Sequence, residues 1–235
     1  MEILKIEACR LLFYPRGALW YVGACIIGAL LLVPFLKAKK LNLALCIGAI
    51  LYIFLLVCNN YFFLVNNTRI ELLIHFYLKY FLSARNGIFV GFLLLAIGIK
   101  CAEIFQNYNK IITTKNMSLM LIPAIFLYVT EVFLIKKFAE GFFREDKGYY
   151  ISQLILVPII LFFALTLKLN VPEKVSRLFR DLSIGIYLLH VPVAFLINFA
   201  KLPYIANFFI VVAVSTSICL FVYHFKKEPF YSLLR

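Results

Sequence analysis

The chain has 235 residues, of which 64% are hydrophobic and 15% are charged, and its mean hydropathy is +0.97. A soluble domain is closer to half apolar and a quarter charged, so the composition excludes an ordinary soluble protein and predicts an all-α polytopic membrane protein. The formal charge of +13 is spread over the loops, which is typical of Lys and Arg flanking membrane spans, so no nucleic-acid partner is expected.

Apolar runs long enough to cross a lipid bilayer, about 20 residues each, recur along the whole chain. They predict seven transmembrane helices, at residues 18–36, 41–65, 87–104, 117–135, 149–167, 182–199 and 205–225. Residues 1–16 form a charged lead-in without a cleavable apolar run. The sequence therefore predicts a single membrane domain over residues 1–235, and a slight excess of Lys and Arg predicts a cytoplasmic C-terminus.

The stretch from Arg69 to Ser83 is too short for a comfortable span and has its own pattern. Glu71, His75 and Lys79 recur every four residues, which places them on one narrow stripe of an otherwise apolar helix. Such a stripe predicts an interfacial helix that lies along the membrane surface or in the mouth of the bundle.

Several polar side chains interrupt the apolar runs. Glu131 lies near Lys136 and Lys137, and is interpreted as part of an interfacial ion pair or of a cavity. Ser152 and Gln153 are predicted to make hydrogen bonds between helices. The six cysteines show no metal-ligand or disulfide spacing, so they are interpreted as packing residues and no metal site is predicted.

A polar seam is predicted in the sixth span, within the sequence DLSIGIYLLHVPV that starts at Asp181. Ser183, Tyr187 and His190 are spaced by four and three residues, so a helix presents them on one face. An ionisable side chain inside a span usually faces the protein interior or a wet cavity. We therefore expect these three side chains to point toward a common cavity, although packing of a buried histidine between helices is the alternative.

This seam resembles the penultimate membrane helix of the acyltransferase-3 family, which consists of bacterial integral membrane O-acyltransferases. The matching residues are Ser183, Gly185, Ile186, Tyr187, Leu188, Leu189, His190 and Pro192. Three further places match in the same order along the chain. They are Leu19, Trp20, Tyr21 and Pro34; Arg85, Asn86, Gly87, Phe89, Gly91 and Gly98; and Glu228, Pro229 and Phe230.

The resemblance implies transfer of an acyl group, normally acetyl, from a cytoplasmic acetyl-CoA or other acyl-CoA to a cell-surface carbohydrate, in the bacterial inner membrane. No bound cofactor is implied. His190 becomes a candidate for lining an acyl-donor or acceptor channel together with Ser183 and Tyr187, and it is the one histidine that could substitute for the family's missing base. Arg85 and Trp20 become candidates for binding substrate. A snorkelling Arg and an interfacial aromatic belt are the alternatives for these two. The cluster Lys174, Arg177 and Arg180 could meet acyl-CoA phosphates, or could simply reflect the positive-inside bias.

The chain also departs from the family. Members have about ten spans, and the first carries an Arg and a His that look catalytic, whereas residues 18–36 hold no charged side chain. The chain therefore resembles the last seven spans, and the resemblance implies that it is catalytically incomplete unless the missing spans are supplied, for example as a separate chain. The alternative hypothesis is a non-enzymatic membrane transporter or accessory subunit.

Overall fold

The computed structural model describes residues 19–81, 83–108, 111–138, 148–167, 170–199 and 203–225, and these residues form eight α-helices without a β-strand. Six helices within these ranges are long and apolar enough to cross a membrane. The structure thus confirms an all-α polytopic membrane protein. The lead-in at 1–16 and the Glu228-Pro229-Phe230 motif lie outside the described residues.

Contacts between the helices divide the described residues into two compact units, one within residues 20–167 and the other within residues 170–225. The prediction of a single membrane domain stays a prediction, and each unit is described by itself. The helices of the first unit are α2 (Leu19–Lys37), α3 (Leu41–Cys58), α4 (Arg69–Tyr80), α5 (Phe92–Tyr108), α6 (Thr114–Phe138) and α7 (Gln153–Thr166). The second unit contains α8 (Glu173–Asn198) and α9 (Tyr204–Phe225).

Two predicted spans of the first unit are shorter in the structure. Helix α3 ends at Cys58, where Asn59 and Asn60 begin a turn that leads to a short 3₁₀ segment, η1 (Phe62–Leu64). The predicted span at 149–167 forms α7, which has 14 residues. A helix of that length is about 21 Å long, less than the roughly 30 Å of a bilayer core. Helix α7 is therefore apolar but too short to cross a membrane unaided.

Close packing of α2 against the start of α5 depends on glycine. Helix α5 is preceded by η2 (Gly87–Gly91), one turn of π-helix. A Cβ atom at Gly91 would overlap the carbonyl oxygen of Ala24, and one at Gly87 would overlap Ile27. The absent side chains thus let the backbones of α2 and η2 touch, which is a common way for membrane helices to associate.

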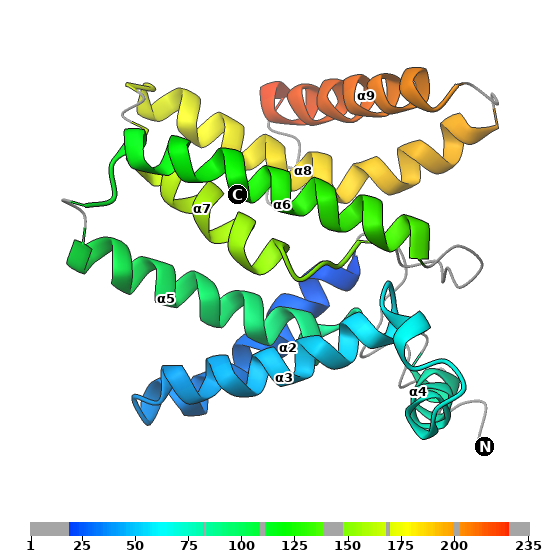
Figure 1. Cartoon of the computed structure of the whole chain (residues 1–235). Coiled ribbons are helices and arrows are strands. Elements are labelled where there is room, and N and C mark those ends of the chain that lie inside the picture. The colour runs from blue at the N-terminus through cyan, green and yellow to red at the C-terminus, as the bar shows by residue number, and fades with distance from the viewer. Residues whose placement is uncertain are drawn as a thin grey trace. The chain divides into compact units, whose positions relative to one another are not determined.

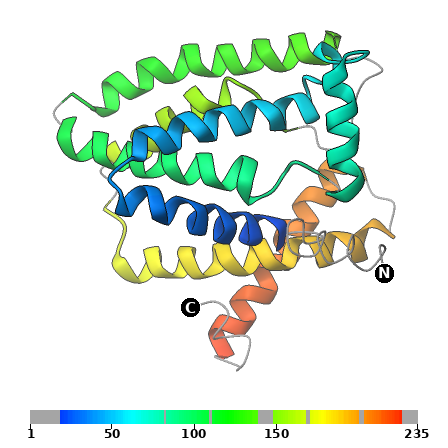
Figure 2. The ribbon, with the colours of Figure 1, turned by 90° about the horizontal axis from the view of Figure 1, so that it is seen from below.

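Helix α4 matches the predicted interfacial segment, although it ends at Tyr80 rather than Ser83. The figures show it running across the direction of α3 and α5, end-on in Figure 1 and upright in Figure 2. Its Ile74 is fully buried, whereas His75 is exposed and its Nε2 lies 3.2 Å from Glu71 Oε1. A helix that crosses the direction of the spans, with one apolar contact side and a polar stripe, fits the membrane interface.

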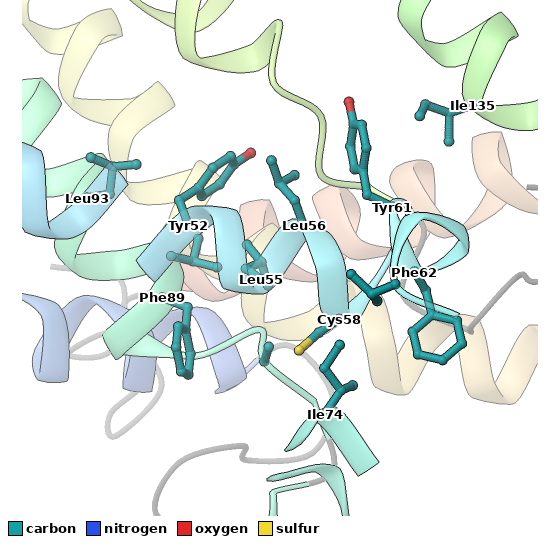
Figure 3. Packing of buried hydrophobic residues seen from close by; sticks show 13 residues of the cluster. Tyr52, Leu55, Leu56, Cys58, Tyr61, Phe62, Ile74, Phe89, Leu93 and Ile135 are labelled. Carbon is teal, nitrogen blue, oxygen red and sulfur yellow. The ribbon is translucent and has the colours of Figure 1, made fainter. Parts of the chain in front are cut away.

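The main core of the first unit lies where α3 ends and α4 crosses. Leu55, Cys58, Ile74 and Phe89 are buried there together, and Figure 3 shows their side chains converging from three segments. We call this region the α4 end of the first unit: the start of α2, the end of α3, the starts of α5 and α7, and the end of α6 (Figure 1). Under the predicted topology it is the outer side of the membrane.

The second unit is a hairpin of two consecutive helices, α8 and α9, that pack against each other. Helix α8 begins at Glu173, well before the predicted start of the span at Leu182. The polar stretch that carries Lys174, Arg177 and Arg180 is therefore the first part of this helix and not a loop. The helix passes through Pro192 without ending there.

Candidate functional site

Asn86 organises the backbone between α4 and α5. Its side-chain oxygen accepts hydrogen bonds from the backbone N–H groups of Ile88 and Phe89, at 3.0 and 3.3 Å, and so caps η2. Its amide nitrogen donates to the Tyr77 hydroxyl of α4 at 2.9 Å. Asn86 is 1% exposed. This residue of the Arg-Asn-Gly motif therefore uses its polar atoms to hold helices together.

Arg85 and Trp20 meet at the α4 end of the first unit. The guanidinium carbon of Arg85 lies 4.5 Å from the centre of the Trp20 ring, which is cation–π geometry. The Arg85 backbone N–H donates to the Ser83 hydroxyl at 3.0 Å, which fixes the segment before η2. The close approach of α2 to Gly87 and Gly91 brings the two side chains together. A guanidinium held on an aromatic face can present N–H donors to a carbonyl or anionic group.

Glu131 is the centre of a second polar cluster at this end. Its carboxylate accepts hydrogen bonds from the Tyr61 hydroxyl and, at 2.8 Å each, from the backbone N–H groups of Ile151 and Ser152. These two N–H groups belong to the start of α7, whose positive dipole end favours a carboxylate. The predicted ion pair with Lys136 or Lys137 is wrong, because Glu131 points to the start of another helix and makes no ion pair within the part of the chain that the structure describes.

Further hydrogen bonds tie α3 to the segment before α7. The Tyr52 hydroxyl donates to the Tyr150 carbonyl at 3.1 Å and to Gln153 Oε1 at 3.4 Å, and Asn60 Nδ2 donates to the Tyr149 carbonyl at 2.8 Å. The interhelical role predicted for Gln153 is confirmed. The Ser152 hydroxyl, also predicted to bond between helices, is buried without a partner among the described residues.

Burial affects the acidity of two phenols near this end. The pKa of Tyr77 is raised because burial disfavours the phenolate, although the hydrogen bond from Asn86 acts in the opposite direction. The pKa of Tyr150 is raised by burial first, and then by the nearby Tyr128 and Glu131. Both hydroxyls therefore stay protonated in neutral solution and act as hydrogen-bonding groups rather than as bases.

The predicted seam residues all lie on α8, in the second unit. Ser183 donates its hydroxyl hydrogen to the Arg180 carbonyl at 2.7 Å, and His190 Nδ1 lies 2.6 Å from the Tyr187 carbonyl oxygen. The rings of Tyr187 and His190 are 5.6 Å apart. The helix thus brings Tyr187 and His190 together, as the spacing indicates. That they face a common cavity stays a prediction, and the structure does not group them with Trp20 and Arg85, which lie in the first unit.

The basic cluster of α8 borders a pocket of about 350 Å³. Its lining residues are Glu173, Lys174 and Arg177 of α8 and Tyr223 of α9. Glu173 and Arg177 form an ion pair one turn apart. Arg180 pairs instead with the adjacent Asp181, at 3.0 Å between Nη2 and Oδ1. Within the described residues, no group of three or more His, Cys, Asp or Glu side chains is placed to hold a metal ion.

Sequence reasoning missed the hydrogen-bonding partners at the α4 end. Tyr61 and Tyr77 look like ordinary aromatic residues of an apolar stretch, and nothing in their spacing links them to Glu131 or Asn86. The available signal was the group of polar residues that interrupts the apolar runs, Asn59, Asn60 and Glu131. Polar side chains in such runs need partners, because an unsatisfied polar group is costly in hydrocarbon.

Comparison with known proteins found a similarity to part of an enzyme. The chain is 30% identical over 178 residues to a serine/alanine racemase of Enterococcus gallinarum. The match covers 73% of this chain but only 23% of that protein, so the chain spans about a quarter of the length of its relative. No family model matches the chain. No solved structure matches it either.

Proposed function

We propose that the chain is part of a membrane O-acyltransferase of the acyltransferase-3 type, which moves an acetyl or similar group from an acyl-CoA to a carbohydrate at the cell surface. The observation that supports this most is the stacking of Arg85 on Trp20 at 4.5 Å. These residues belong to two separate motifs that resemble the family, and the fold brings them to one place. In this proposal the protein lies in the cytoplasmic membrane with its C-terminus in the cytoplasm.

The chemistry assigns roles to these side chains. A base removes the proton of the sugar hydroxyl, the oxygen attacks the thioester carbonyl, and the CoA thiolate leaves as the ester forms. The Arg85 guanidinium is suited to stabilise the carbonyl oxygen when it carries negative charge, and the Trp20 ring holds the guanidinium in place. The family resemblance assigns the role of base to a histidine in spans that this chain does not match. Within this chain, His190 is the candidate that could take that role.

A gene-disruption experiment tests the proposal without requiring this chain to act alone. Surface carbohydrate of the disrupted strain should lose ester-linked acyl groups, measured as acetate released by mild base. Wild-type chain should restore them, whereas Arg85→Ala and Trp20→Ala should not, at equal amounts of protein in the membrane. Arg69→Ala is the matched control, since Arg69 starts α4 and is not stacked on Trp20. An unchanged ester content in the disrupted strain would contradict the proposal.

A non-enzymatic membrane protein, such as a transporter or accessory subunit, is the second candidate. The observation behind this candidate is that the chain matches about a quarter of a longer relative, which is itself named for amino-acid racemisation rather than acyl transfer. A membrane module of this kind would affect the uptake of a small molecule and leave surface esters intact. The same disrupted strain separates the two candidates, if uptake of labelled serine and alanine is measured beside the ester content.

A further inference from the structure

The pocket between the start of α8 and the end of α9 has features of an anion site. It has a volume of about 350 Å³, and three of its four lining residues are Lys174, Arg177 and Tyr223. Glu173 also lines it and neutralises part of the charge by pairing with Arg177. No ion pair involves Lys174 within the described residues. One ammonium group is therefore available in the pocket, and a guanidinium with further N–H donors lies beside it.

The pocket lies at the border between polar and apolar parts of the hairpin. In α8 the charged turns end at Asp181, and the apolar run begins at Leu182. In α9 the apolar run ends near Tyr223, and it is followed by His224 and, outside the described residues, by Lys226 and Lys227. A pocket at such a border is at the depth of lipid headgroups, where Tyr, Lys and Arg are enriched.

We propose that this pocket binds a phosphate group presented at the membrane surface. Lys174 would supply a point charge and Arg177 a planar donor pair, while the N-terminal turn of α8 adds partial positive charge. The Glu173 carboxylate competes with the phosphate for Arg177, so it sets the affinity. The phosphate belongs either to an anionic phospholipid headgroup or to a soluble coenzyme A thioester. Binding of a phospholipid headgroup does not depend on the acyl transfer proposed above, whereas binding of coenzyme A would make this pocket a donor site and rests on that proposed function.

Native mass spectrometry of the full chain in a neutral detergent tests the site. Phosphatidylglycerol is titrated in one arm, coenzyme A in another, and a neutral diacylglycerol serves as the control ligand. Lys174→Gln/Arg177→Gln should weaken the first phosphatidylglycerol or coenzyme A binding event by about tenfold or more, since each basic side chain contributes strongly near a lipid surface. Lys136→Gln/Lys137→Gln removes the same charge from the end of α6 and should change binding by less than about twofold.

Loss of binding in the double variant could also result from misfolding, so a second variant that should bind more tightly is measured as well. Glu173→Gln releases Arg177 from its ion pair, so it should bind the same phosphate ligand about threefold or more tightly. The arm in which these changes occur identifies the phosphate source. The proposal is overturned if both double variants lose binding equally, if Glu173→Gln weakens binding, or if wild type binds neither phosphate ligand better than diacylglycerol.

Discussion

The α4 end of the first unit and the predicted seam of α8 use polar side chains in different ways. At the α4 end of the first unit, Glu131 and Asn86 make hydrogen bonds with side chains of other segments: Glu131 with Tyr61, which is 70 residues away, and Asn86 with Tyr77 of α4, which is nine residues away. On α8, Ser183 and His190 make theirs with carbonyls three residues earlier in the same helix. Polar atoms of the first kind hold the tertiary structure together, whereas those of the second kind are satisfied by the helix itself.

This difference predicts where substitution should destabilise the fold and where it should affect function alone. When one side chain of a hydrogen bond between two segments is removed, the group that it bonded is left buried and without a hydrogen bond. A side chain that bonds its own helix can be removed without exposing a second element. Substitution of the polar residues at the α4 end should therefore lower the free energy of unfolding strongly. Substitution of the predicted seam residues of α8 should lower it only slightly.

The largest expected effect is that of Glu131→Ala. It removes an acceptor from the Tyr61 hydroxyl and from two backbone N–H groups at the start of α7, so the free energy of unfolding should fall by about 3–5 kcal/mol. Denaturant titration in detergent measures the loss. Glu103→Ala is the control. Glu103 pairs with Lys100 on the exposed surface of α5 at 3.0 Å, and the loss of this surface ion pair should cost less than about 1 kcal/mol. Equal losses for the two variants would remove the distinction between the two kinds of polar residue.

Gly91→Ala comes next, because it tests the packing that brings Trp20 to Arg85. The new Cβ would overlap the Ala24 carbonyl oxygen, so α2 must shift away from η2, at a cost of about 1–3 kcal/mol. We expect a lower melting temperature and a change in Trp20 fluorescence, since Trp20 is the one tryptophan of the chain. Gly98→Ala has open space around its Cβ and should leave both readouts near those of wild type. Unchanged fluorescence in Gly91→Ala would show that this contact does not position Trp20.

Asn86→Ala should have an intermediate effect of about 2 kcal/mol, from loss of the cap on η2 and of the bond to Tyr77. Asn86→Asp keeps the capping oxygen but cannot donate to the Tyr77 hydroxyl in the same way. It should therefore recover about half of the lost stability, as measured by thermal unfolding in detergent. If Asp is no better than Ala, the bond to Tyr77 and not the cap is the important interaction.

The smallest stability effect is expected for His190→Ala, which removes one bond within α8 and should cost about 1 kcal/mol or less. Its effect on the ester content of surface carbohydrate, measured as above, should be much larger if His190 contacts substrate. A stability loss as large as that of Glu131→Ala would instead place His190 among the residues that hold the fold together. The variant thus tests the α8 side of the comparison directly.

The sequence by itself determined the class of protein and most of its helices. Membrane insertion follows from the transfer of long apolar runs into lipid, which depends on local composition, so the six long helices and α4 could be predicted from their residues alone. The spacing of Tyr187 and His190 also predicted their proximity, because neighbours on one helix are fixed by its period. These properties are local, and a single sequence contains them in full.

Only the tertiary structure decided which distant residues meet. The bond of Glu131 to the start of α7, the contact of Asn86 with Tyr77 and the stacking of Arg85 on Trp20 join segments that have no common period. The early start of α8 was also hidden, because its first turns are polar and resemble a loop next to an apolar run. Hydrogen-bonding partners depend on how helices cross, and that is set by close contacts such as Gly91 against Ala24, which a hydropathy pattern does not encode.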